Sequence, residues 1–285
     1  MRKDNFRVSV IVPAFNEEGC ILLLVERLLK ILQRYFDYEI LFIDDGSNDG
    51  TLQLLKKVHS ENPKINFLSF SRNFGHQSAL RAGTLHASGD CIISLDADLQ
   101  HPPELIPDLI DHWKEGYDIV YTIRKDDRKI SFFKKITGWI FYKAMNLISD
   151  INFEQGEADF RLLDRNAAAE LNNLSESAVF LRGMVKWLGF KQIGITYVPD
   201  ERVWGGTKYS KRKMFGLAIS GITGFSIKPL RISTLIGVSI AFLSLLYGIY
   251  ALYIKFFTNN SIEGWTSVFF MVTFIGGIQL IMIGI

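Results

Sequence analysis

The stretch SLDADLQHPPE, residues 94–104, contains two carboxylates and an amide at alternate positions, Asp96, Asp98 and Gln100. They follow an apolar run, residues 91–95, that has the composition of a buried strand. On an extended chain the side chains alternate between two faces, so Asp96, Asp98 and Gln100 are expected to point the same way. Such oxygen donors repel one another unless water or a cation lies among them. The spacing alone does not establish a cation site, because most Asp-x-Asp pairs are turn or capping residues, and the context has to decide.

Acidic residues also follow two earlier apolar runs. Asn16, Glu17 and Glu18 come after VSVIVPA, and Asp44 and Asp45 end YEILFIDD before a Gly-Ser turn. Ligands of parallel sheets bind beyond the carboxyl ends of the strands. A shared ligand site explains three acidic strand ends better than three unrelated turns do.

The remaining motifs narrow the kind of ligand. No G-x-G-x-x-G follows the first apolar run and no G-x-x-x-x-G-K-[ST] occurs, so dinucleotide and P-loop sites lose their main support. An EF-hand loop starting at Asp96 fails because His101 stands where Gly is needed and Pro107 where Glu is needed. Several acids with few glycines fit a diphosphate held through bridging Mg²⁺ or Mn²⁺.

The elements that must position these residues alternate between strand-like and helix-like over residues 8 to about 122. The expected strands are residues 8–14, 38–45, 65–70, 91–95 and 118–122. The expected helices are residues 17–33, a helix from about residue 51, and residues 78–86. This alternation predicts an α/β fold with a mainly parallel sheet covered on both faces.

The C-terminal part has a different composition. The chain of 285 residues is 48% hydrophobic, and residues 232–254 and 265–285 contain no charged side chain. Each run reaches the ~20 apolar residues that cross a bilayer. We predict a catalytic domain over residues 1–228 and a transmembrane region over 229–285, with helices at about 230–255 and 266–285. Two buried core helices are the alternative. The second run continues to the last residue, and we expect a tail beyond it.

The distribution of charge predicts the orientation. Cations gather before the first run, at Lys208, Lys211, Arg212, Lys213, Lys228 and Arg231. The loop between the runs holds only Lys255 and Glu263 as charged residues. The positive-inside bias therefore places the N-terminal domain in the cytoplasm. Two cysteines give no disulfide framework, and the N-terminus has no apolar run typical of a signal peptide.

Six motifs, followed by the two apolar runs, resemble the polyprenyl-phosphate glycosyltransferases of glycosyltransferase family 2. In order they are VSVIVPAFNEE, ILFIDDGSNDGT, SRNFGHQSALRAG, SGDCIISLDADLQHPPE, EADFRLLDR and ERVWGGTKY. The bacterial subgroup that acts on undecaprenyl phosphate is the most similar, and dolichol-phosphate mannose synthase is a more distant relative. The resemblance covers nearly the whole chain. It implies a GT-A type sheet flanked by helices, followed by interfacial helices and two transmembrane helices in the inner (plasma) membrane.

The resemblance also implies roles for individual residues. The nucleotide-binding positions are Pro13, Phe15, Glu17, Ile43, Asp45 and Asp96. The metal-binding triplet for Mg²⁺ or Mn²⁺ is Asp96, Asp98 and Gln100. The cations placed against donor and acceptor phosphates are Arg124, Lys134, Arg202 and Lys208, with Lys135 as an alternative to Lys134. Asp159 matches an acid near the sugar and, with Asp98 and Arg202, forms the expected catalytic set. Trp204 departs from some relatives, which have a second Arg there.

The implied reaction transfers glucose or N-acetylglucosamine from a UDP-sugar to undecaprenyl phosphate, with inversion, for modification of cell-wall glycans or lipopolysaccharide. Charge grows on the leaving diphosphate, and a divalent cation with Arg or Lys stabilises it. The attacking phosphate is already ionised at pH 7, since its second pKa is about 6. Asp159 is therefore expected mainly to position the substrate, and a role as general base is the second option.

The expected partners are the nucleotide sugar, the polyprenyl phosphate lipid and the membrane, with a homo-oligomer as a further option and no nucleic acid. Residues 129–149 and 210–228 mix bulky apolar side chains with lysines. They can lie in the membrane interface with the apolar face down, or pack on the catalytic domain.

Two rival functions remain open. A processive polysaccharide synthase would show a Q-x-x-R-W motif and more spans, and FLRGMVKW, residues 180–187, does not match. An inactive homologue could act as a membrane scaffold, but the intact acid triplet and basic positions argue against that role.

Overall fold

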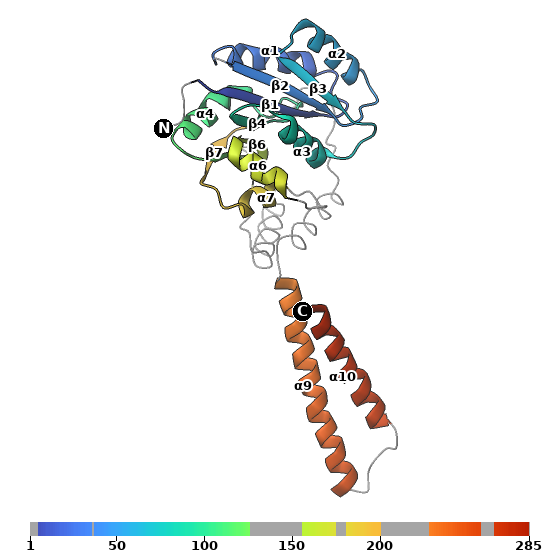
Figure 1. Ribbon diagram of the computed structural model, residues 1–285. Helices are drawn as coiled ribbons and strands as arrows, with labels where there is room; N and C mark the ends of the chain where they lie inside the picture. The colour runs from blue at the N-terminus through green and yellow to red at the C-terminus, as the bar shows by residue number, and fades with distance from the viewer. Residues whose placement is uncertain are drawn as a thin grey trace. The chain divides into compact units, whose positions relative to one another are not determined.

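The computed structural model describes residues 5–35, 37–125, 156–174, 181–200, 228–257 and 265–284. These residues fall into two compact units. One unit contains the sheet with its helices, and the other contains the C-terminal helices α9 and α10 (Figure 1). The predicted interfacial segments, residues 129–149 and 210–228, lie outside the described residues except for Lys228, which begins α9.

A seven-stranded sheet forms the centre of the first unit, in the order β3-β2-β1-β4-β6-β5-β7. The strands are β1 (Arg7–Ala14), β2 (Asp37–Asp44), β3 (Ile65–Ser69), β4 (Cys91–Ser94), β5 (Ile119–Arg124), β6 (Glu157–Asp164) and β7 (Gln192–Tyr197). All neighbours pair in parallel except β6, which is antiparallel to both β4 and β5. The mainly parallel α/β sheet predicted from the sequence is confirmed.

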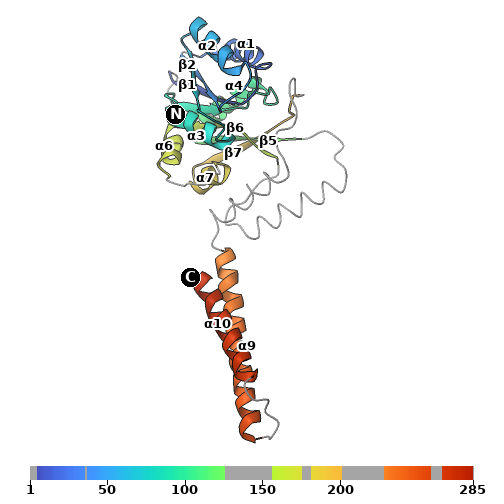
Figure 2. The same ribbon diagram turned by 90° about the vertical axis from the view of Figure 1, so that its right-hand side faces the viewer.

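Helices cover both faces of this sheet (Figure 2). They are α1 (Ile21–Leu32), α2 (Thr51–Glu61), α3 (His76–His86), α4 (Ile106–Lys114), α6 (Arg165–Asn173) and α7 (Leu181–Trp187), with the short helix η1 (Pro103–Leu105) before α4. Helices α1, α2 and α4 lie on one side of the sheet, and α3, α6 and α7 lie on the other. The alternation of β1 explains this division: Val8, Val10 and Val12 join the core under α1 and α4, while Ile11 faces α3.

Two glycines allow close approach of the segments that lead to the acidic strand ends. Gly46 has φ +71°, and a Cβ there would lie 2.5 Å from the backbone of Arg72. A Cβ at Gly83 on α3 would lie 2.7 Å from the Ile43 side chain on β2. Only glycine fits both positions without a shift of the neighbours. The loop after β2 therefore packs directly against the loop at Arg72, and helix α3 packs directly against the sheet.

The chain is not extended through the acidic stretch as the sequence predicted. Strand β4 ends at Ser94, and the following residues form a turn in which Leu99 has φ +63°. A left-handed leucine is unfavourable on its own, but here its side chain is fully buried, which stabilises the turn. The prediction that Asp96, Asp98 and Gln100 share one face of a strand was wrong, because these residues lie on a turn.

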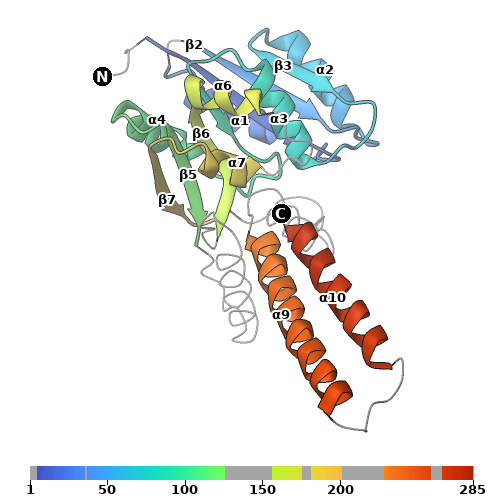
Figure 3. The ribbon, with the colours of Figure 1, turned by 60° about the horizontal axis from the view of Figure 1, so that its bottom comes forward.

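The second unit is a pair of apolar helices, α9 (Lys228–Phe257) and α10 (Trp265–Gly284), which lie side by side (Figure 3). They pack closely: a Cβ at Gly237 would lie 2.7 Å from the carbonyl oxygen of Gly277, and the Ser233 hydroxyl donates to the Leu280 carbonyl at 3.1 Å. Within the described part of the chain, one helix is long and apolar enough to cross a membrane, over Leu230–Ile254. The apolar part of α10, Phe270–Ile283, is shorter, so the second span stays a prediction.

Candidate active site

The turn after β4, at the carboxyl end of the central strand of the sheet, carries the predicted metal ligands. Asp98 is only 7% exposed, and its Oδ1 accepts the backbone N–H of Gln100 at 3.1 Å. The side chain of Asp96 is about one-third exposed. The turn therefore presents one carboxylate to solvent and uses the other partly to hold its own backbone.

His101 stabilises this turn through a hydrogen bond. The backbone N–H of Asp96 donates to His101 Nδ1 at 3.0 Å, so Nδ1 acts as an acceptor and the proton belongs on Nε2. The ring is buried and stacks on Phe160 of β6, with ring centroids 5.3 Å apart. The imidazole thus connects the acidic turn to the sheet, a role that the sequence did not reveal.

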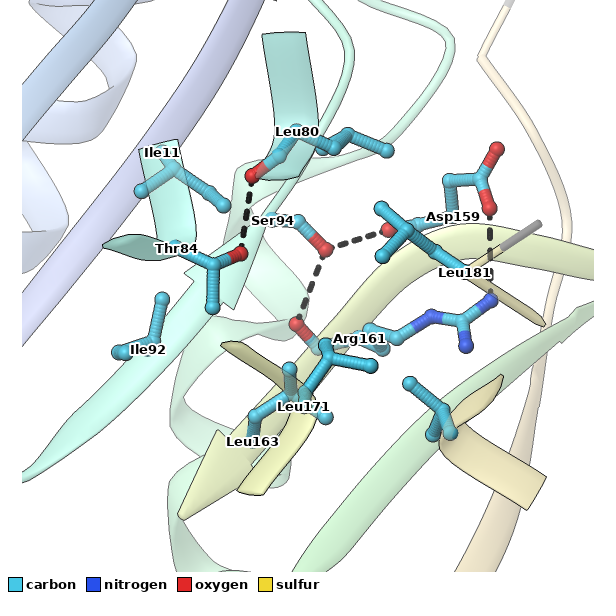
Figure 4. Close-up of a pocket in the computed structure, with 11 residues that line it drawn as sticks. Ile11, Leu80, Thr84, Ile92, Ser94, Asp159, Arg161, Leu163, Leu171 and Leu181 are labelled. Carbon is cyan, nitrogen blue, oxygen red and sulfur yellow. Dashed lines mark hydrogen bonds and ion pairs between the residues drawn. The ribbon is translucent and has the colours of Figure 1, made fainter. Parts of the chain in front are cut away.

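Asp159 lies next to this turn because β6 runs antiparallel to β4. The pairing of Ser94 with Arg161 continues toward Asp96 and Asp159, and the Ser94 hydroxyl donates to the Asp159 carbonyl at 2.5 Å (Figure 4). The Asp159 side chain is 5% exposed. Apolar side chains of α3, β1 and α7, among them Ile11 and Leu181, line a small cavity beside it. The carboxylate therefore sits in a largely water-free setting, where charge interactions are strong.

Four side chains contact the Asp159 carboxylate through polar atoms. Arg182 of α7 donates from Nε to Oδ1 at 2.8 Å and from Nη2 to Oδ2 at 2.9 Å. Gln77 of α3 donates to Oδ2 at 3.3 Å, and Arg161 of β6 donates to Oδ1 at 3.4 Å. The fourth is His76, whose Nε2 lies 3.4 Å from Oδ2. These contacts fix the orientation of the carboxylate.

His76 links Asp159 to the acidic turn. Its Nε2 lies 3.4 Å from Asp96 Oδ1 as well as 3.4 Å from Asp159 Oδ2. Burial lowers the pKa of His76, but the charge of Asp96 and the hydrogen bond to Asp159 outweigh it and raise that pKa to about 9. Burial would raise the pKa of Asp159, yet the charge of Arg182 and the contacts with His76 hold it well below the usual range. The His76 imidazole therefore lies between two carboxylates, 3.4 Å from each.

Arg124, at the end of β5, reaches the same turn. Its Nη1 lies 3.5 Å from Gln100 Oε1, and the backbone N–H of Asp200 donates to the Gln100 carbonyl at 3.3 Å. The chain that leaves β7 thus starts beside the acidic turn. The other three predicted phosphate-binding cations lie outside the described residues: Lys134, Arg202 and Lys208.

The predicted nucleotide-binding loops after β1 and β2 are tied to each other. The backbone N–H of Asn16 donates to Ser47 Oγ at 2.9 Å, and that of Glu17 donates to Thr51 Oγ1 at 2.9 Å. Asn16 has φ +54°, which directs the chain across the end of the sheet. Pro13 belongs to β1, Phe15 is half-buried and Glu17 is buried.

Asp45 accepts hydrogen bonds from the loop before α3, and Ile43 is part of the core. The Asp45 carboxylate accepts the backbone N–H groups of Phe74 at 2.7 Å and of Gly75 at 3.0 Å, which fixes the loop that leads to His76. Ile43 is fully buried in the sheet. The contacts of Asp45 connect the nucleotide-binding loops to the His76 cluster, and the base-contacting role of both residues stays a prediction.

The acidic turn suits a hard cation that shares its coordination with a substrate. Among the described residues no group of three or more His, Cys, Asp or Glu side chains could hold a metal ion by itself. Two carboxylates and an amide on one turn leave positions for water and diphosphate oxygens, the usual arrangement for Mg²⁺ and Mn²⁺ beside phosphates. The oxygen donors of Asp96, Asp98 and Gln100 are of the kind that such an ion binds, and their role as its ligands stays a prediction.

Sequence reasoning missed His76, Gln77 and Arg182. The first two lie in SRNFGHQSALRAG, which carried the family resemblance, and Arg182 lies in FLRGMVKW, which was considered only as a possible synthase motif. No spacing rule connects these segments with Asp159, because they meet only in the folded sheet.

A mainly parallel sheet with an acidic turn at the end of its central strand defines a class, the GT-A type glycosyltransferases. The family model described as Glycosyl transferase family 2 matches residues 9–171. The chain belongs to this family and is a glycosyltransferase.

Similar proteins support this assignment over nearly the whole chain. The uncharacterized glycosyltransferase YkcC of Bacillus subtilis (strain 168) is 41% identical over 99% of this chain and 87% of its own length. The bactoprenol glucosyl transferase of Shigella phage SfV is 39% identical over 98% of this chain and 91% of its own length. The crystal structure of glucosyl-3-phosphoglycerate synthase from Mycobacterium tuberculosis, in complex with Mn²⁺, UDP and glucosyl-3-phosphoglycerate, shares the fold. It superimposes with a TM-score of 0.51 at 17% identity, over 75% of this chain and 76% of that one.

Proposed function

We propose that this enzyme transfers glucose from UDP-glucose to undecaprenyl phosphate, with inversion at the sugar. UDP-N-acetylglucosamine is the second candidate donor. The observation that carries the proposal is the pairing of an acidic turn with Asp159 through His76, in a chain 39% identical to a bactoprenol glucosyl transferase. The product, a polyprenyl-phosphate sugar, would serve modification of a cell-envelope glycan.

The side chains at the site suit a reaction that needs little base catalysis. The acceptor phosphate is ionised at neutral pH, since its second pKa is about 6. Asp159, held by Arg182 and His76, is suited to accept hydrogen bonds from sugar hydroxyls and so to orient the donor. A base role for Asp159 is the second option.

The leaving diphosphate needs positive charge around it. A divalent cation at Asp96, Asp98 and Gln100 would supply Lewis-acid stabilisation of that group. Arg124 stands beside the same turn, and we propose that it acts together with the other predicted cations, Lys134, Arg202 and Lys208. Charge-assisted contacts of this kind strengthen as charge develops on the phosphate oxygens.

We further propose that the lipid acceptor is reached from the cytoplasmic face of the inner membrane. Helix α9 supports an anchored enzyme, since Leu230–Ile254 is long and apolar enough to span. A second span at α10 would return the chain to the cytoplasm, which is where nucleotide sugars are made. The catalytic domain would then occupy residues 1–228, with the interfacial segments leading into the membrane.

Transfer assays on the purified full chain test this proposal. The chain, in lipid nanodiscs, is incubated with undecaprenyl phosphate and with UDP-glucose, UDP-N-acetylglucosamine or GDP-mannose, and the lipid products are identified by mass spectrometry. One sugar per lipid, formed with UDP-glucose and abolished by EDTA, is expected. A growing polymer would instead favour the processive synthase, and UDP binding without transfer from any donor would favour the scaffold.

A further inference from the structure

Helix α7 and strand β6 face each other through a set of charged side chains, of which the proposed reaction involves Asp159 and Arg182. Glu157, Asp159 and Arg161 alternate along β6 and are all buried. Helix α7 contributes Arg182 and Lys186, which lie one turn apart and so on one face of the helix. Arg182 pairs with Asp159, and Lys186 pairs with Glu157 at 2.7 Å.

These two ion pairs differ in geometry. The guanidinium of Arg182 engages both oxygens of Asp159, at 2.8 and 2.9 Å, so it fixes the plane of the carboxylate as well as its position. Lys186 contacts only one oxygen of Glu157, at 2.7 Å, and Arg161 lies 3.6 Å from the other oxygen. The bidentate pair is therefore the one beside the acidic turn.

Arg182 is itself placed by α3. The Oε1 atom of Gln77 accepts the backbone N–H of Leu181 at 3.0 Å, while its Nε2 donates to Asp159 at 3.3 Å. One glutamine side chain therefore connects the start of α7 to the acid that α7 holds. The neighbouring His76 extends the connection from Asp159 to Asp96.

We propose that Arg182 is a positioning residue for sugar transfer: from α7 it sets the orientation of the Asp159 carboxylate toward the donor sugar. The inference rests on the proposed function, because it takes Asp159 to contact that sugar. The guanidinium of Arg182 comes from a helix outside the sheet and orients the Asp159 carboxylate. That carboxylate is linked to Asp96 through the Nε2 atom of His76, which lies 3.4 Å from each acid. Misplacement of an orienting group by about 1 Å can cost on the order of a hundredfold in rate.

Lys186 provides the matched control, because it lies on the same helix and pairs with the same strand but does not contact Asp159. The test compares Arg182→Lys, which keeps the charge and loses the fork, with Lys186→Gln. Loss of one or two charge-assisted bonds predicts a kcat about ten- to a hundredfold lower in Arg182→Lys. Lys186→Gln is expected to lower the unfolding temperature while its kcat stays within about threefold of the wild type.

Binding measurements separate positioning from a general loss of structure. The Kd of UDP, which lacks the transferred glucose, should be unchanged in Arg182→Lys, whereas the ratio of the UDP-glucose Kd to the UDP Kd should rise about tenfold. These titrations need no lipid acceptor and also report the folded fraction. An unchanged ratio together with a wild-type kcat would overturn the proposal, and so would equal weakening of both ligands.

A double variant tests whether Arg182 acts through Asp159. Arg182→Gln combined with Asp159→Asn removes both charges, so no buried charge is left without a partner. If Arg182 only orients Asp159, the double variant should be as slow as Asp159→Asn alone. Additive losses would contradict positioning. Wild-type transfer by Asp159→Asn would instead refute the role of Asp159, and absence of transfer by the unmodified chain would refute the proposed function.

Discussion

Replacement of His101 by Phe removes one hydrogen bond from the acidic turn and keeps the rest of the packing. Phenylalanine preserves an aromatic ring against Phe160 but cannot accept the backbone N–H of Asp96, which now meets Nδ1 at 3.0 Å. This hydrogen bond is partly buried, so the N–H of Asp96 would lose its acceptor where water has limited access. Leaving a buried donor unsatisfied costs about 1–3 kcal/mol.

The consequence for cation binding can be worked out from this cost. If the turn relieves it by moving, Asp96 leaves the position in which it faces His76 and the proposed metal. Conversion of about 1–3 kcal/mol into an equilibrium constant predicts a Mn²⁺ activation constant raised by about 5- to 150-fold. The maximal rate at saturating Mn²⁺ should fall much less, because Asp98 and Asp159 are unchanged.

The assay is lipid-linked sugar formation at a series of Mn²⁺ concentrations, with thermal unfolding measured on the same preparations. His101→Asn is the matched control, since its amide oxygen can take the place of Nδ1 while the ring stack on Phe160 is lost. That variant should lose stability but retain a near-normal Mn²⁺ constant. A wild-type Mn²⁺ constant in His101→Phe, or an equal shift of that constant in both variants, would contradict a role of this hydrogen bond in cation binding.

Four further expectations can be checked on the full chain. Asp98→Asn should abolish most transfer with little change in the unfolding temperature, and full activity with unaltered Mn²⁺ dependence would defeat the metal assignment. Arg124→Ala should lower kcat/KM for transfer about ten- to a hundredfold through a lost charge-assisted phosphate contact, whereas a wild-type value would leave it outside the site. Burial would raise the pKa of Glu39, but hydrogen bonds from two serines and the charge of an arginine lower it; its stabilisation is therefore present above the usual pKa of 4.5 and is lost as pH falls through the lower folded value. The unfolding temperature of Glu39→Gln should accordingly depend less on pH in this acidic range, and identical profiles would contradict this. A cysteine at Asn260 should react with an impermeant thiol reagent in intact cells and one at Ser210 should not, while the reverse pattern would overturn the topology.

Most of the parallel part of the sheet was predictable because its strands are apolar runs, but β7, which pairs in parallel with β5, was not predicted. VSVIVPA and YEILFID bury almost every side chain, so their composition indicates the strand directly. Strand β6 was not predicted, although all eight of its residues are buried. Its sequence EADFRLLD holds four ionisable residues, and only ion pairs formed in the folded state compensate their burial. Sequence periodicity cannot show such pairs.

The candidate site was predictable where motifs carried it and not where long-range contacts did. Asp96 and Asp98 follow a strand-like run and were singled out from their spacing together with the other acidic strand ends and the family resemblance. The turn geometry depends on Leu99 at φ +63°, a conformation that a leucine in the sequence does not indicate. His76 and Arg182 lie 83 and 23 residues away from Asp159 in sequence. They meet Asp159 because an antiparallel strand enters a parallel sheet, a feature that local propensity does not encode.

The antiparallel direction of β6 gives the two acidic parts of the site different mechanical properties. Asp159 belongs to a strand paired on both sides, whereas Asp96 and Asp98 belong to a turn. One side of the site is therefore rigid in backbone, and the other can adjust to an ion or a diphosphate. Redesign of donor specificity should accordingly leave β6 and Arg182 unchanged and vary other residues of α3 and α7, which can change without disturbing the strand pairing.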